Sequence, residues 1–95
     1  MTSRANRISA VLTGHFAPAV LHVADDSAKH AGHAGAAPGG QTHYSVLMVA
    51  EAFRGEPRIA RQRAVHAALH AEFGTGLHAL QLTLRTPEEH AAIGT

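Results

Sequence analysis

Apolar residues recur at helical spacing near the start of the chain. Between Ser3 and Pro18, the large apolar side chains fall three or four positions apart: Ile8, Val11, Leu12 and Phe16. This period places them on one face of a helix, and Ser3 is suited to cap its N-terminus. The pattern predicts a first helix that Gly14 and Pro18 limit.

Two segments rich in β-forming residues flank a long stretch of glycine and alanine. Residues 19–24 read as a short strand that stops at the turn-forming residues 25–27. Residues 42–50 are apolar on both faces toward their end, as in a well-covered strand. Residues 26–41 between them predict a flexible loop, across which the two strands pair as an antiparallel hairpin.

The second half of the chain carries one long helical pattern and one alternating pattern. After a break at residues 53–57, residues 58–73 repeat at helical spacing and stop at Gly74, a common helix-ending residue. Their apolar stripe consists of Ile59, Val65, Leu69 and Phe73. Residues 77–84 then alternate, which predicts a third strand. One face of this strand carries His78, Leu80, Leu82 and Leu84.

A short last helix completes the expected fold. Thr86 is suited to cap this helix, Pro87 to begin it, and two glutamates to face its positive end. The order α-β-β-α-β-α, without internal repeats, predicts a single α+β domain over residues 1–95. Because the third strand returns after a helix, a crossover is required. The result is a three-stranded mixed sheet with helices packed on one face.

The composition narrows the function classes. The 95 residues are 45% hydrophobic and 16% charged, as in one ordinary globular domain. Cysteine is absent, which excludes disulfides, thiol nucleophiles and a self-sufficient thiolate metal site. The formal charge of +1 differs from the strongly basic balance of a dedicated nucleic-acid binder. No apolar run approaches the roughly 20 residues that span a bilayer, and we expect a cytoplasmic protein.

Histidine is unusually abundant, with nine in the chain. Neutral imidazole is a common metal ligand, so these residues are the first candidates for chemistry. His66 and His70 are spaced like the pair of a zinc protease helix, but Ala67 stands where such a helix carries glutamate. His43 is expected to cap or pack rather than bind metal. No nucleophile with a base and an orienting group is evident, and we expect no enzyme.

Short motifs along the chain resemble those of the BolA family in order and spacing. In the first half they are Phe16-Ala17-Pro18, Asp25-Asp26-Ser27, His30-Ala31-Gly32-His33 and Thr42-His43-Tyr44. In the second half they are Phe53-Arg54-Gly55, Arg61-Gln62-Arg63-Ala64-Val65-His66, Leu77-His78-Ala79-Leu80 and Thr86-Pro87-Glu88-Glu89. The resemblance covers about residues 8–90. Gln62 stands where the family commonly has a histidine. Any role that this histidine has in the family is therefore in doubt for this chain, whereas the resemblance to the family is not.

The resemblance implies a fold similar to the class II K-homology arrangement and a non-enzymatic adaptor. Such a protein works with a monothiol (CGFS-type) glutaredoxin in iron-sulfur cluster assembly, trafficking or iron regulation. The resemblance further implies that a [2Fe-2S] cluster is shared between the two proteins, with thiolates from the glutaredoxin and histidine from this chain. His78 and His30 match the cluster-proximal positions of the family, and His33 is a substitute for His30. The isolated protein is expected to hold no cofactor tightly and to be a monomer or weak homodimer.

Two alternatives stay open. The first is a DNA-binding transcriptional regulator that uses the arginine-rich helix 58–73, through Arg54, Arg58, Arg61 and Arg63. On a helix, Arg61 and Arg63 point about 160° apart, so both cannot lie on one phosphate backbone. The second is a plain interaction module with no metal chemistry.

Overall fold

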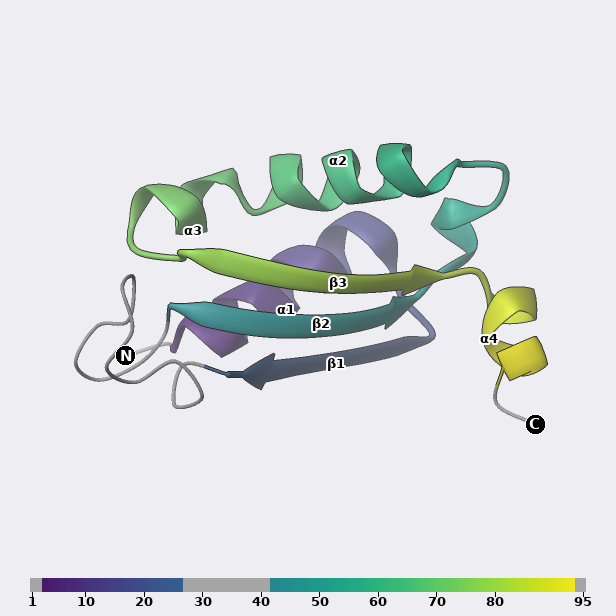
Figure 1. Ribbon diagram of the computed structural model, residues 1–95, viewed down its shortest axis with the longest axis horizontal. Coiled ribbons are helices and arrows are strands. Elements are labelled where there is room, and N and C mark those ends of the chain that lie inside the picture. Colours follow the sequence, from purple (N-terminus) through teal and green to yellow (C-terminus); the bar gives the residue numbers. More distant parts are fainter. Residues whose placement is uncertain (1–2, 27–41, 94–95) are drawn as a thin grey trace.

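The computed structural model describes residues 3–26 and 42–93 of the chain. The elements, in chain order, are α1 (Arg4–Phe16), β1 (Val20–Asp25), β2 (His43–Val49), the 3-10 turn η2 (Glu51–Phe53), α2 (Arg58–Ala68), α3 (His70–Gly74), β3 (Ala79–Arg85) and α4 (Pro87–Ile93). They confirm the expected α-β-β-α-β-α order (Figure 1). The loop expected over residues 26–41 lies, apart from Asp26, outside the described residues.

The three strands form one mixed sheet in the order β1-β2-β3. Strands β1 and β2 pair antiparallel, with Val20 opposite Val49, as the hairpin prediction requires. Strand β3 pairs parallel to β2, with His43 opposite Ala79, and α2 and α3 form the crossover. In Figure 1, α1 lies behind the strands and α2 runs along β3, and side chains of both helices join one core with β2. The parallel register brings the first residues of β2 and β3 together.

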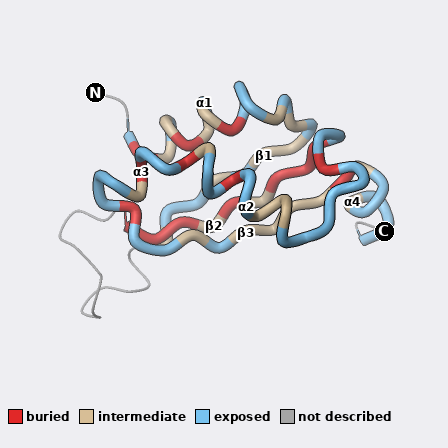
Figure 2. Tube along the Cα trace, turned by 90° about the horizontal axis from the view of Figure 1, so that it is seen from above, coloured by how far each residue is buried: buried red, intermediate tan, exposed pale blue. Residues whose placement is uncertain are grey.

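The core lies between β2 and the two long helices. Side chains on one face of β2 are almost completely buried, among them Tyr44, Val46 and Met48. Helix α1 packs against them through Ile8 and Leu12, which are fully buried as the helical pattern predicted. Figure 2 shows this buried zone running through the middle of the domain. Burying one such side chain contributes about 1.5–3 kcal/mol, so this layer fixes the relative positions of the sheet and helices.

The prediction of one continuous helix over residues 58–73 is wrong, because the helix is interrupted at Leu69. Leu69 ends α2 with φ −98° and ψ 14°, and α3 starts at the next residue. The break lets the Phe73 ring stack on the His66 ring at 5.2 Å. It also brings Glu72 to the arginines of α1. Ile59, expected in the buried stripe, is 59% exposed because the first turn of α2 faces solvent there.

Helix α4 is fixed to the end of the sheet by a reciprocal cap and two ion pairs. The Glu89 amide donates to Thr86 Oγ1 at 3.2 Å, and the Thr86 amide donates to Glu89 Oε1 at 2.8 Å. Arg61 of α2 donates to both carboxylate oxygens of Glu89, at 2.6 and 3.1 Å. Arg54 lies 2.6 Å from the Glu88 carboxylate. The cap confirms the prediction made for Thr86 and Pro87, whereas the two ion pairs were not foreseen.

We expect α4 to loosen in acid. Hydrogen bonds from Arg61 and from the Thr86 amide lower the pKa of Glu89 to about 2. Because this pKa is lowered in the folded state, the stabilisation is complete above the ordinary glutamate value and is lost as the pH falls toward 2. Hydrogen exchange of the Ala91 and Ala92 amides, corrected for intrinsic rates, should show this loss.

The matched control for the acid effect is Glu89→Gln. Glutamine keeps an acceptor for the Thr86 amide but removes the charge that pairs with Arg61. Protection of α4 should therefore be lower in this variant near neutral pH and should change little in acid. Wild-type protection that stays constant down to a pH of about 2 would contradict the prediction.

Among the described residues, no helix is both long and apolar enough to cross a lipid bilayer.

Candidate functional site

His78 lies immediately before β3, and its side chain is exposed to solvent. Its amide and that of Ala79 donate to the same acceptor, the Thr42 carbonyl oxygen, at 2.7 and 3.0 Å. When two consecutive amides donate to one carbonyl, the strand has one extra residue there, as in a β-bulge. The alternation of side chains between the two faces of the sheet is therefore interrupted at this point. As a result Leu77 enters the core together with the leucines of β3. The prediction that His78 shares their face is therefore wrong, and its imidazole is accessible.

His43, the first residue of β2, contacts the His78 ring with its own ring. Its ring centroid lies 5.3 Å from that of His78, with the planes tilted by 49°. His43 is only 7% exposed, and its Nδ1 lies 2.9 Å from Thr42 Oγ1. His43 is thus buried and hydrogen-bonded, and its ring contact with His78 was missed; the packing against the long loop that was expected for it involves residues outside the described ones. The available signal was that Thr42-His43 and Leu77-His78 both open strands that run in parallel.

The other predicted histidines, His30 and His33, lie outside the described residues. Whether His30 approaches His78 is therefore still a prediction. The residues on either side of the undescribed segment do lie at the site. The Asp26 amide donates to the His43 carbonyl at 2.7 Å, and Thr42 accepts from the His78 amide. Asp26 and Thr42, the described residues nearest in the chain to His30 and His33, therefore both lie next to His43.

An arginine from α1 holds the loop that carries His78. Arg4 donates to the Thr75 carbonyl at 2.9 Å and to Thr75 Oγ1 at 3.0 Å. It also pairs with the Glu72 carboxylate at 2.8 Å, with both side chains no more than 10% exposed. Arg7 donates to the same carboxylate, and its hydrogen bonds, together with the charges of both arginines, lower the pKa of Glu72. The turn between α3 and β3 is thus tied to the first turn of α1.

Replacing Gly76 with alanine is expected to disturb this turn. Gly76 has φ +126°, and a Cβ there would lie 2.9 Å from Nη2 of Arg4. The strained backbone costs about 1–3 kcal/mol, and Arg4 must also shift away from Thr75. Urea unfolding should show this loss. Gly14→Ala is the control, since a Cβ at Gly14 meets nothing within 4 Å in an ordinary helix and should stabilise by about 0.5–1 kcal/mol. Equal stability of the two variants would contradict the prediction.

The donor set limits what the site can hold. Across residues 3–26 and 42–93, no three histidine, aspartate or glutamate side chains gather in a metal-binding group. The chain also has no cysteine to supply a thiolate. A cavity of about 200 Å³ opens beside His43, with Asp26 and Gln81 in its lining. Among the described residues, the exposed imidazole of His78 is thus suited to a [2Fe-2S] cluster only as one ligand, with the others supplied from elsewhere.

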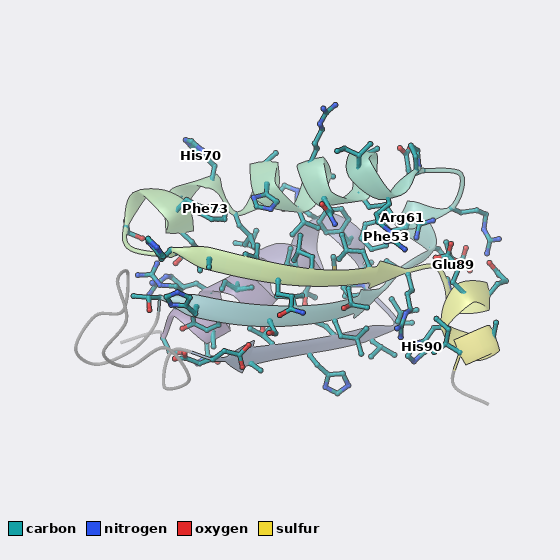
Figure 3. The ribbon with its side chains drawn as sticks, viewed as in Figure 1. Phe53, Arg61, His70, Phe73, Glu89 and His90 are labelled. Carbon is teal, nitrogen blue, oxygen red and sulfur yellow. The ribbon has the colours of Figure 1, made fainter. Side chains whose placement is uncertain are left out.

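The four arginines predicted for DNA binding differ in their surroundings. Arg54 pairs with Glu51 and Glu88, and Arg61 pairs with Glu89 while lying 5.7 Å over the Phe53 ring. Arg58 and Arg63 are exposed and form no ion pair within the described part of the chain. Figure 3 shows Arg61 and Glu89 side by side between α2 and α4. Arg54 and Arg61 are thus already paired with carboxylates, with which a phosphate group would have to compete.

Comparison with known proteins gives one consistent family. Residues 12–89 match the family described as BolA-like protein. The chain is 38% identical over 89 residues to the chloroplastic protein BOLA1 of Arabidopsis thaliana, covering 92% of this chain and 56% of that protein. It is 35% identical over 83 residues to the DNA-binding transcriptional regulator BolA of Escherichia coli, covering 87% and 75%.

Solved structures agree with this match. The BolA domain of SufE1 from Arabidopsis thaliana has a TM-score of 0.84 at 37% identity, covering 94% of this chain and 98% of that one. The BolA1 protein of Mus musculus has a TM-score of 0.77 at 28% identity, covering 96% and 71%. Several relatives are longer than this chain. It spans 24% of a SufE-like protein of Arabidopsis thaliana and 51% of the human BolA-like protein 1.

Proposed function

The chain belongs to the BolA family, and from that premise we propose that it is a non-enzymatic adaptor in iron-sulfur cluster assembly, trafficking or iron regulation. In this role it binds a monothiol glutaredoxin and contributes the imidazole of His78 to a shared [2Fe-2S] cluster. The observation that carries the proposal is an exposed imidazole at a fixed point of the backbone in a chain without cysteine. His30, with His33 as substitute, is the proposed second ligand.

The chemistry of the proposal follows from the donors that the chain offers. A [2Fe-2S] cluster takes four protein ligands, and two of them are histidines in one known class, with a raised reduction potential. Of the thiolate and imidazole ligands that such clusters use, this chain can supply only imidazole, so the sulfur ligands belong to the partner. The exposed ring of His78 reaches an arriving iron atom without local unfolding. Its backbone, held by Thr42 and indirectly by Arg4, keeps the donor at one place.

His78→Ala is expected to abolish formation of the shared cluster. The test mixes the protein with a cluster-loaded monothiol glutaredoxin and follows visible circular dichroism, which reports the ligand environment of the iron. Even the loss of an outer partner costs a metal site about 10- to 100-fold in affinity, so loss of a ligand should cost at least as much. The wild-type spectrum should change on mixing, whereas that of the variant should not.

His70→Ala is the matched control. His70 is also an exposed histidine, and it points away from the sheet on the outer side of α3 (Figure 3). The control should behave as the wild type does. A spectrum that changes equally with His78→Ala, or fails to change with the wild type, would disprove the role of His78.

The DNA-binding alternative receives less support from the structure. Its favourable observations are the exposed Arg58 and Arg63 and the similarity to a relative named as a DNA-binding regulator. Against it, Arg54 and Arg61 are occupied by carboxylates. Phosphate contacts release counterions, so DNA binding must weaken steeply with salt and depend on Arg58 and Arg63 if this alternative holds.

The remaining expectations on setting are part of the same proposal. We propose a cytoplasmic protein that is a monomer or weak homodimer when alone and that holds no cofactor tightly. One relative is named as chloroplastic, so the compartment is not common to the whole family. Analytical ultracentrifugation of the purified chain would measure the oligomeric state.

A further inference from the structure

Thr42 connects the two histidines at the start of β2 and β3 through separate groups. Its carbonyl oxygen accepts the amides of His78 and Ala79, at 2.7 and 3.0 Å. Its hydroxyl Oγ1 lies 2.9 Å from Nδ1 of His43. Thr42 is itself only 7% exposed, so water competes little for either of these hydrogen-bonding groups. One buried residue therefore sets both the backbone of His78 and the ring orientation of its neighbour.

The two rings differ sharply in their environment. His43 is buried and hydrogen-bonded, so its ring has little freedom to rotate. The His78 ring is exposed, and no side-chain hydrogen bond restrains it within the described residues. Its ring contact in this part of the structure is His43, at 5.3 Å between centroids. An exposed side chain that becomes fixed on binding loses rotamer freedom, and a rigid wall beside it reduces that loss.

We propose that His43 is a positioning residue for His78, holding its imidazole in the orientation in which it binds iron. The inference rests on the proposed function of His78 and adds the residues that orient it. Thr42 is the anchor: its hydroxyl fixes the His43 ring, and that ring supports one side of the His78 ring. His43 acts from behind and is not itself a ligand, because the protein covers most of its ring and Thr42 engages Nδ1. Outer partners that orient metal-binding histidines commonly have this role.

The test compares variants that remove each part of this support. Thr42→Val keeps the shape of the side chain and both backbone hydrogen bonds but removes the hydroxyl. Thr42→Ser restores the hydroxyl and should rescue the loss. His43→Ala removes the wall, whereas His43→Phe keeps a ring of similar size that makes no hydrogen bond to Thr42. Thermal unfolding of each variant shows whether the fold survives, and His70→Ala is the control.

Two readouts are measured. In the isolated protein, NMR contacts between the ring protons of His43 and His78, and relaxation of the His78 ring carbons, report its orientation. In the mixture with cluster-loaded monothiol glutaredoxin, visible circular dichroism gives the apparent affinity. Thr42→Val and His43→Ala should weaken the ring contacts, raise the mobility of His78 and lower the affinity about three- to tenfold. Thr42→Ser should return both readouts to the wild-type values, and His43→Phe should give an intermediate result.

The outcomes separate this inference from the proposed function. If His78→Ala abolishes the cluster signal while folded Thr42→Val and His43→Phe match the wild type in both readouts, the positioning role is disproved and the function stands. If His78→Ala has no effect, the proposed function itself fails. If His43→Ala abolishes the signal as completely as His78→Ala and removes a nitrogen coupling from the electron paramagnetic resonance of the reduced cluster, His43 is a ligand and the positioning role is overturned.

Discussion

Glu72→Gln is expected to lower the melting temperature by about 12–24 °C. The Glu72 carboxylate lies 2.8 Å from Nη1 of Arg4 and 3.0 Å from Nε of Arg7. The side chains of Glu72 and Arg4 are 10% and 9% exposed. Removing one partner of a buried pair leaves a buried charge without compensation and costs about 3–5 kcal/mol. Glutamine still accepts a hydrogen bond, so we take the lower value, and each kcal/mol shifts the melting temperature of such a domain by about 4–8 °C.

The acid dependence of stability gives this prediction a second measurement. Hydrogen bonding by Arg7, with the charges of Arg7 and Arg4, lowers the pKa of Glu72. The stabilisation by Glu72 is therefore complete above the ordinary glutamate pKa of about 4.5 and is lost as the pH falls below it. Glu72→Gln should lose less stability than the wild type over this acid range. Parallel curves for the two proteins would contradict the assignment.

The control for Glu72 is a salt bridge of similar geometry at the surface. Glu51 lies 2.7 Å from Arg54, but the two side chains are 66% and 54% exposed. Solvent screens this pair, and Arg54 retains Glu88 when Glu51 is replaced. Glu51→Gln should therefore leave the melting temperature almost unchanged. A shift as large as that of Glu72→Gln would show that burial does not govern the effect.

Phe53→Ala is the second change with a large expected effect. Phe53 is 2% exposed, its ring lies 5.4 Å from that of Phe16, and the Arg61 guanidinium covers it at 5.7 Å. Truncation removes the buried ring and leaves a cavity, which costs about 3–5 kcal/mol. Arg61 also loses the surface that supports it against Glu89, so α4 should become more mobile. Urea unfolding measures the first effect and hydrogen exchange the second.

Ile59→Ala is the apolar control for Phe53. Ile59 is as hydrophobic as a core residue, but it is 59% exposed in the first turn of α2. Its truncation removes little buried area, so the free energy of unfolding should change by less than about 0.5 kcal/mol. Similar losses for Phe53→Ala and Ile59→Ala would disprove the burial assigned to these two residues.

Local signals in the sequence were sufficient to place the N-terminal ends of α1 and α4. Ser3 accepts a hydrogen bond from the Asn6 amide, as a capping serine does, and Thr86 forms a reciprocal cap with Glu89. Each of these contacts joins residues three positions apart, so the pattern along the chain contains all the partners. The order of helices and strands along the chain was likewise predicted from local patterns, namely the apolar periodicity and the turn residues. The structure confirms these predictions.

The features that were missed depend on contacts between distant residues. The break at Leu69 places the Glu72 carboxylate where it accepts a hydrogen bond from Arg4. These two residues are 68 positions apart in the chain. Phe53 was taken for part of a chain break, and its burial follows from packing against Phe16. The meeting of His43 and His78 requires the parallel register and the shared carbonyl of Thr42. The family resemblance identified His78 as a candidate, whereas periodicity placed it among the leucines, and neither could show its neighbour.

The bonds between Arg4 and Thr75 join two places that are far apart in the chain. Arg4 is the first residue of α1, and Thr75 lies three residues before His78. In a longer polypeptide, a domain fused ahead of α1 would emerge next to the proposed iron ligand rather than at the opposite pole. Such a fusion would need no long linker to deliver its own chemistry to a glutaredoxin docked there, and its bulk would also determine which partners have access.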